Sequence, residues 1–215
     1  QHDLTNRVTR AHKAGLRVGI DGLGDRGIDR ALDAVESALK NIPWEDHRHR
    51  IEHCCYVPPR IQERLKKLRV IDASANGFLY DLGDAYKANR GEKQMRWMWP
   101  HRSLIDLGIP APAHSDCPVC SPNPWIGIYG LVTRKTSSGD ILYSGEGITP
   151  LEAIKAYTID GAYAAWEEEV KGSIEPGKLA DLVLIDRDPL TIPPEDLKNV
   201  KTVITIINGK IVYKR

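Results

Sequence analysis

The sequence lacks a large excess of charge of either sign, a membrane-length apolar run, and any basic stretch interleaved with aromatic residues. Thirty basic and 29 acidic residues nearly cancel, and aromatic residues make up only 7% of the chain. These absences argue against a nucleic-acid groove, which needs clustered Lys and Arg, and against a transmembrane protein. Hydrophobic residues still make up 41% of the 215 residues, so we expect an ordinary soluble globular chain with a sizeable core.

Cysteine is also scarce, and its spacing does not match the disulfide framework of a small secreted domain. The four cysteines form two close pairs, Cys54-Cys55 and Cys117-Pro-Val-Cys120. Because thiols persist in reducing compartments, we expect a cytoplasmic location. The sequence starts at Gln1 without a methionine and enters a helix-like stretch at once, so we expect a fragment whose missing start leaves room for a signal peptide.

Short apolar strands alternate with amphipathic helices through the first three quarters of the chain. Segment 28–40, for example, carries an apolar residue every three or four positions. Thr149, Pro150 and Glu152 supply the cap, the first-turn proline and the acidic residue that begin a helix. Strands are predicted over 15–21, 50–55, 70–75 and 108–116, and helices over 2–14, 28–40, 59–68, 91–107 and 149–166, with 117–148 irregular.

Four strand-and-helix units imply parallel strands joined by helical crossovers. A closed (β/α)8 barrel has eight such units in about 250 residues, so residues 1–166 are predicted to form half of a TIM-like barrel. Two prolines, Pro110 and Pro112, argue against a regular strand over 108–116, since proline cannot donate to a sheet ladder. The fold class is therefore expected to be α/β.

After residue 166 the pattern changes to β only. Strands are predicted over 182–185, 202–207 and 210–214, and Asn208-Gly209 is a strong hairpin sequence. We therefore expect residues 167–215 to form a separate C-terminal unit of strands.

Three histidines lie in or just before the predicted strand 50–55, and their positions relative to it distinguish them. In a parallel barrel the functional groups gather at the C-terminal ends of the strands. His47 and His49 have a metal-binding His-x-His spacing but precede the strand, so we expect them in a solvent-facing loop at the opposite end. His53 lies at the C-terminal end, on the alternation of Ile51, and we expect its imidazole to point into the barrel mouth. A hydrogen-bonded core histidine is the alternative.

Carboxylates and a further imidazole follow two other predicted strands. Asp21 ends the first strand, and His114 and Asp116 end the fourth. Together with His53 these are the ligand types that hold Zn²⁺ or a similar divalent ion at an open, catalytic site. Each of these residues alone is weak evidence for a metal site, because an aspartate after a strand is commonly a cap or turn residue.

Five blocks of sequence follow one another in a distinctive order along the chain. They are "GLGDRGIDRALDAVE", "RHRIEH", "RSLIDLGIPAPAHSDCPV", the long "TPLEAIKAYTIDGAYAAWEEEVKGSIEPGKLADLVLIDRDPL", and "TVITIINGKIVY". In this order they resemble the amidohydrolase superfamily, specifically its amidohydrolase-3 type of metal-dependent hydrolase. The resemblance covers nearly the whole chain.

The resemblance implies a barrel with a small β-sandwich beside it, and a site with one or two divalent metals, of which zinc is the first candidate. It matches His53 to the metal-binding histidine of the sixth barrel strand. It matches Asp116 to the eighth-strand aspartate that contacts the metal and transfers protons. Strand-and-helix units five to eight would then lie in residues 1–166, part of the sandwich in 167–215, and the other ligands in a missing N-terminal half.

The chain departs from the family pattern at several positions. Asp21 stands where the family usually has a histidine; its oxygen can still ligate a metal but changes the metal preference. His114 replaces a small residue two positions before Asp116, on the same strand face by alternation, where it could compensate. Asn76, after the third strand, and Arg134, in the long irregular segment, are the candidates for substrate binding.

The resemblance implies hydrolysis of a C–N bond in a small-molecule amide, N-acyl or cyclic amide substrate by a metal-activated water. Asp116 would accept the proton of that water and pass it to the leaving nitrogen. Two other classes stay open. The chain could be a non-catalytic half-barrel that pairs its sheet edges with a second copy, giving a homo-oligomer. It could also be a metal-independent binding protein on a degenerate scaffold, which Asp21 and Asn76 favour.

Overall fold

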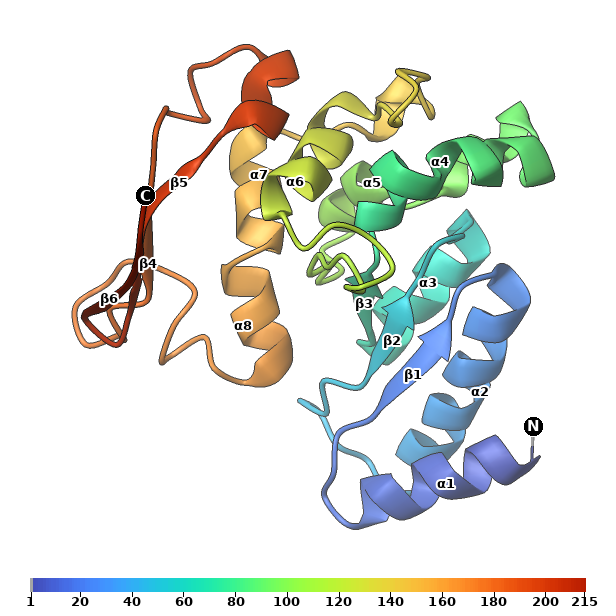
Figure 1. The fold of residues 1–215 in the computed structure, drawn as a ribbon. Helices are drawn as coiled ribbons and strands as arrows, with labels where there is room; N and C mark the ends of the chain where they lie inside the picture. The colour runs from blue at the N-terminus through green and yellow to red at the C-terminus, as the bar shows by residue number, and fades with distance from the viewer. Residues whose placement is uncertain (1) are drawn as a thin grey trace.

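The computed structural model describes residues 2–215, which form two sheets accompanied by helices (Figure 1). The first sheet has three parallel strands in the order β1-β2-β3, and helices connect them. The predicted alternation of strands and helices is confirmed for these three units. Helix α1 (His2–Lys13) comes first, followed by β1 (Gly19–Gly22), α2 (Asp25–Asn41), β2 (Arg50–His53), α3 (Pro59–Leu68), β3 (Ile71–Ser74) and α4 (Gly77–Arg90).

Apolar faces of α2 and α3 pack against the sheet. Ile28 and Leu32 of α2, Ile61 of α3 and Ile51 of β2 are fully buried in one cluster. Removing each such side chain from water stabilises the fold by about 1.5–3 kcal/mol. This packing holds α2 and α3 against the sheet.

The register of the sheet aligns the three strand ends. Gly22 of β1 pairs with His53 of β2, and His53 pairs with Ser74 of β3. The residues that follow the strands are consequently brought to one edge of the sheet. This is the edge at which the sequence predicts a site.

The fourth predicted strand, 108–116, runs beside β3 but is not a regular strand. The carbonyls of Pro110 and Pro112 accept backbone N–H groups of β3, and the N–H of His114 donates to the carbonyl of Ser74 in β3. Pro112 has no N–H to give back, so only an isolated parallel bridge forms. The predicted position is right, and the prolines explain why a regular strand is not formed.

The helical prediction over 91–107 is right only in part. This region holds a 3-10 helix (Glu92–Trp97) and the short α5 (His101–Asp106), while α4 and α6 (Pro124–Thr133) were not predicted at all. Helix α6 buries residues around most of its circumference, so no polar stripe marks it in the sequence. None of the helices in residues 2–215 has the length and apolar character to cross a bilayer.

The capping sequence at Thr149 begins a helix as predicted. The Thr149 hydroxyl accepts the N–H of Glu152, and the Glu152 carboxylate accepts the N–H of Thr149. The predicted single helix is nevertheless two, α7 (Pro150–Ala156) and α8 (Ile159–Ala165). The break lies at Thr158, whose φ of −129° and ψ of −91° are outside the helical region.

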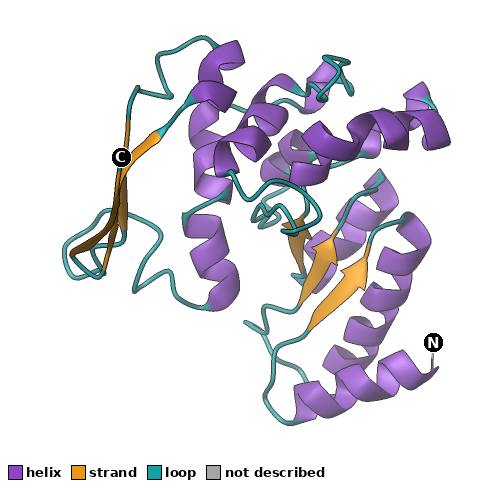
Figure 2. Ribbon diagram, viewed as in Figure 1, coloured by secondary structure: helices purple, strands orange, loops and turns teal. Residues whose placement is uncertain are grey.

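A second sheet lies at the C-terminal end of the chain, and Figure 2 shows α7 and α8 between the two sheets in this view. Its strands are antiparallel, in the order β4 (Leu182–Ile185), β5 (Thr202–Ile207) and β6 (Lys210–Lys214). Asn208 and Gly209 have φ values of +48° and +74°, as the predicted two-residue turn requires. In the described part of the chain this unit is one three-stranded layer.

Candidate metal and catalytic site

His53 is the residue around which the candidate site is built. It ends β2 with a φ of +74°, which is uncommon for a residue with a side chain. Regular alternation would have turned it to the helix-covered side, with the fully buried Ile51. The positive φ ends the extended run, and the imidazole instead faces two carboxylates. The turn at His53, rather than alternation, therefore sets where the ring lies.

The two carboxylates approach different nitrogens of His53. Oδ1 of Asp21 lies 3.4 Å from Nε2, and Oδ2 of Asp116 lies 3.9 Å from Nδ1. The side chain of Asp21 is 80% exposed and that of Asp116 38%, whereas that of His53 is only 14% exposed. Among the described residues, no hydrogen-bond partner reaches the buried Nδ1 of His53. An orphaned buried nitrogen beside a carboxylate is a position at which a further bound group would be accommodated.

His114 lies next to His53, with 5.6 Å between the ring centroids. Its Nε2 is 3.0 Å from the carbonyl oxygen of Ala73, which can only accept, so Nε2 carries the proton and Nδ1 keeps a lone pair. Burial lowers the pKa of His114 and favours the neutral ring. A neutral imidazole with a free lone pair is the form that ligates metals. Asp116 follows in a turn, with a φ of +53°.

The four predicted ligands, Asp21, His53, His114 and Asp116, are thus brought to one region without forming a complete metal site. Within residues 2–215, no three His, Cys, Asp or Glu side chains converge closely enough to hold an ion. The donor types suit a divalent cation, and the orphaned Nδ1 of His53 fits such a role. This part of the chain therefore offers a partial donor set.

Asn76 follows β3 and is fully buried. Its Oδ1 accepts a hydrogen bond from the Tyr157 hydroxyl, at 3.1 Å, and its Nδ2 finds no acceptor among the described residues. Burial raises the pKa of Tyr157, so this hydroxyl keeps its proton and remains a donor. The role of Asn76 toward a substrate stays a prediction.

Arg134 has a different place from the predicted one. The residue is completely buried, and its guanidinium donates to the backbone carbonyls of Leu142, Trp99 and Met98 at 3.0, 2.9 and 2.7 Å. Burial lowers its pKa to about 10, which still leaves it charged at neutral pH. The prediction that Arg134 binds substrate is wrong, because its hydrogen bonds are already used inside the fold. Arginine is rarely buried unless paired, so no sequence pattern predicts the burial of Arg134.

His47 and His49 are buried, at 2% and 0% exposure, so the prediction of a solvent-facing loop is also wrong. Nδ1 of His49 accepts the N–H of Val18, and Nε2 of His49 lies 2.9 Å from Nδ1 of His12. His47 accepts the N–H of His49 and donates to the carbonyl of Leu68. Burial lowers the pKa of both, that of His49 to about 3. They stabilise the end of β2 opposite the candidate site.

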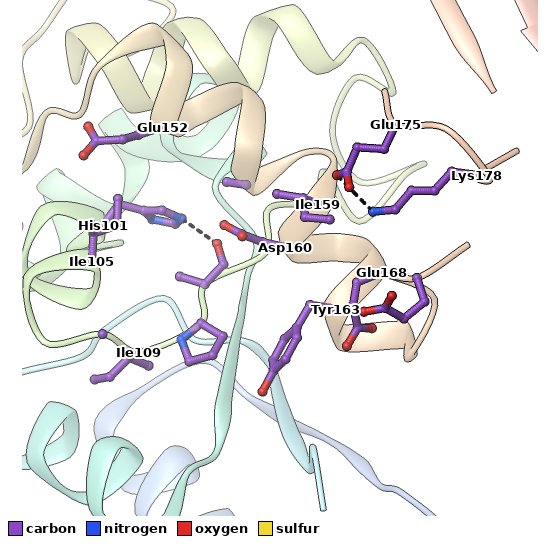
Figure 3. A pocket seen from close by; sticks show the side chains of 15 residues that line it. His101, Ile105, Ile109, Glu152, Ile159, Asp160, Tyr163, Glu168, Glu175 and Lys178 are labelled. Atoms are coloured by element: carbon purple, nitrogen blue, oxygen red, sulfur yellow. Dashed lines mark hydrogen bonds and ion pairs between the residues drawn. The ribbon is translucent and has the colours of Figure 1, made fainter. Parts of the chain in front are cut away.

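A cavity of about 610 Å³ lies elsewhere, bordered by residues 108–111 and by helices α7 and α8 (Figure 3). None of the four predicted ligands lines it. Two of its carboxylates are already paired, Glu152 with Arg102 and Glu168 with Arg48, each at 2.7 Å. These acidic side chains hold elements of the fold together, so we place the candidate chemistry at His53 and not in this cavity.

Phe78 contacts the candidate site in a way that the sequence pattern does not reveal. Its ring stacks on that of His53, with 5.8 Å between centroids and 16° between planes. It is the only phenylalanine in the chain and lies at the start of α4, the helix that was not predicted.

Several known proteins are similar to this chain. The model of the amidohydrolase family matches residues 1–213. The N-substituted formamide deformylase of Arthrobacter pascens is 34% identical over 216 residues, covering 100% of this chain and 39% of that protein. Protein LONG AFTER FAR-RED 3 of Arabidopsis thaliana is 30% identical over 212 residues, covering 98% of this chain and 36% of that protein.

Among solved structures, an uncharacterized metal-dependent hydrolase from Pyrococcus horikoshii OT3 superposes with a TM-score of 0.76 at 26% identity. The match covers 90% of this chain and 38% of that one. The chain thus spans about two fifths of the length of the relatives it matches. Since the family match extends over almost every residue, the chain belongs to the amidohydrolase family.

Proposed function

We propose that the protein containing this chain hydrolyses a C–N bond in an amide, N-acyl or cyclic amide substrate. The observation that carries the proposal is the meeting of His53 with Asp21 and Asp116 at the C-terminal ends of the strands, in a member of the amidohydrolase family. The name of the Arthrobacter relative, a formamide deformylase, supports a C–N bond as the target.

We also propose that residues 1–166 are units five to eight of a (β/α)8 barrel and that 167–215 are part of a β-sandwich. The chain covers only about two fifths of the length of its relatives. This supports a barrel whose other half is supplied by the same protein, or by a second copy in a homo-oligomer. Exposed apolar residues on β6, Ile211 and Val212, are consistent with a further layer over this sheet. Four free thiols favour a cytoplasmic location.

The residues that would hold a metal are His53 and Asp116, with Asp21 and His114 as additional donors. A bound divalent ion, with zinc as the first candidate, would lower the pKa of a water molecule and polarise the substrate carbonyl. The partial donor set implies that further ligands come from outside the described residues.

Asp116 is the proposed general base and acid. Its carboxylate is 38% exposed and lies beside His53, so it can reach both a water molecule in the site and an incoming substrate. It would remove a proton from the attacking water and later give that proton to the departing nitrogen. Buried His53 would stay fixed while Asp116 moves the proton.

Replacing Asp116 with asparagine tests this role. Asparagine keeps the size of the side chain but cannot take up the proton, so we expect kcat to fall by about 10²–10⁴-fold. The measurement is amine release from a panel of N-substituted formamides and N-acyl amines. Asp106→Asn, which removes an exposed carboxylate on α5, should leave the rate nearly unchanged. Full activity in Asp116→Asn would exclude the proposed role.

A second candidate is a metal-independent binding protein on the same fold. The specific observation in its favour is that no three donors converge within residues 2–215, together with Asp21 at the position of the usual histidine. It predicts a folded protein of natural length that copurifies with no divalent metal and hydrolyses no amide in the same panel.

A further inference from the structure

We infer that Phe78 is a positioning residue, which fixes the plane of the His53 imidazole by stacking on it. The two rings are offset and nearly parallel, with 5.8 Å between centroids and 16° between planes. This inference deepens the proposed function, and rests on it where it concerns metal binding. The contact itself lies wholly within this chain.

His53 lacks the orienting hydrogen bond that a metal-binding histidine normally has. Such a histidine usually donates its second ring nitrogen to a carboxylate or a backbone carbonyl. Here the approaches of Asp21 at 3.4 Å and Asp116 at 3.9 Å are longer than an ordinary hydrogen bond, and Nδ1 has no partner among the described residues. The ring plane must therefore be set by packing.

Phe78 is itself held rigidly. It is 4% exposed and belongs to a buried cluster that includes Leu79, Met98 and Trp99. The preceding residue, Gly77, lies so close to the 113–116 segment that an added Cβ would come within 2.9 Å of the Ser115 Cα. The start of α4 is thus locked beside the turn that carries Asp116.

The stacking face limits the directions in which the His53 nitrogens can point. His114 approaches His53 at a tilt of 56°, so it does not offer a second parallel face. With Phe78 on one side, the ring nitrogens are directed along the plane toward Asp21 and Asp116. An aliphatic residue at position 78 would fill space without fixing this plane.

The test compares Phe78→Leu with Phe78→Tyr in the metal-free protein of natural length, at one fixed pH. Stacking shifts the ring protons of His53 upfield in nuclear magnetic resonance spectra. We expect this shift to be lost in Phe78→Leu and kept in Phe78→Tyr, because tyrosine retains the ring. Leu82→Ala, on the same helix and against the same cluster, controls for a simple loss of packing and should keep the shift.

Zinc titration of the same variants provides the second measurement. We expect Phe78→Leu to weaken zinc binding about three- to tenfold, and Phe78→Tyr to bind as the wild type does. Unchanged His53 shifts in a folded Phe78→Leu variant, or unchanged zinc affinity with the shift lost, would overturn the inference. If no variant binds zinc, the wild type included, the proposed function fails, while the shifts still decide whether Phe78 positions the ring.

Discussion

Single polar residues in and around the candidate site differ in how far their hydrogen bonds are satisfied. Arg134 uses its guanidinium on three carbonyls, and His114 has one nitrogen bonded to a carbonyl. His53 has a buried Nδ1 with no partner among residues 2–215. Buried polar groups are nearly always bonded, so an unsatisfied nitrogen beside two carboxylates leaves room for a bound water or ligand. Arg134 therefore stabilises the fold, whereas the place of His53 beside two carboxylates supports the proposal that it takes part in chemistry.

Arg134→Met should destabilise the protein strongly. Methionine fills much of the volume but donates no hydrogen bond, so the carbonyls of Met98, Trp99 and Leu142 are left unsatisfied. We expect the free energy of unfolding to fall by about 3 kcal/mol, measured by urea denaturation. Arg10→Met, on the exposed surface of α1, should change it by less than about 0.5 kcal/mol. Equal stability of the two variants would contradict the assigned role of Arg134.

Residue type and place along a strand were enough to select His53, Asp21, His114 and Asp116, and the structure brings these four to one region. They were not enough to predict the positive φ of His53, which depends on the chain that follows it. The contact with Phe78 was also beyond local patterns, because it joins residues from different strand-and-helix units.

At the scale of elements, the network of His12, His47 and His49 ties α1 to the start of β2. His12 donates through Nε2 to the carbonyl of Ile42, and His49 accepts the N–H of Val18, so each ring has one donor and one acceptor in use. Burial lowers the pKa of His47 and of His49, which favours the neutral form of both rings. Adding a proton would set two donors against each other.

Stability should therefore fall in acid. The pKa of His49 is about 3 in the folded protein against 6.5 ordinarily, so between these values the unfolded chain binds more protons. The free energy of unfolding then decreases as pH is lowered through this window, by up to about 1.4 kcal/mol per pH unit, and His49 adds no slope above it. In His49→Gln the urea-denaturation midpoint should depend less on pH between about 7.5 and 5 than in the wild type. Parallel pH profiles would refute the network's role.

The sequence predicted well those helix starts and turns that are set by residues close together in the chain. The capping box at Thr149 and the Asn208-Gly209 turn act through neighbouring residues, and both are present. Helices α4 and α6 lack a clear polar stripe, so their existence depends on tertiary packing. The burial of His49 likewise depends on His12 of α1, more than 30 residues earlier in the chain, and buried His47 bonds to Leu68, 21 residues later.

At the scale of the whole molecule, a parallel sheet and an antiparallel sheet are accompanied, within residues 2–215, by a partial set of metal donors. The parallel sheet orders the strand ends and so brings His53 and Asp116 together. The family relatives are much longer than the chain, which agrees with a site completed by other residues. The proposed contribution of this chain to a larger metal site is a proton-transferring aspartate, Asp116, and one fixed imidazole, His53.

Metal content by mass spectrometry, on purified protein of natural length, tests this claim most directly. The wild type should carry about one or two divalent ions per chain, His53→Ala should carry clearly fewer, and Asp106→Asn should match the wild type. Circular dichroism would establish that all three are folded. A folded wild type without metal, or equal metal in the wild type and His53→Ala, would contradict the proposed metal site.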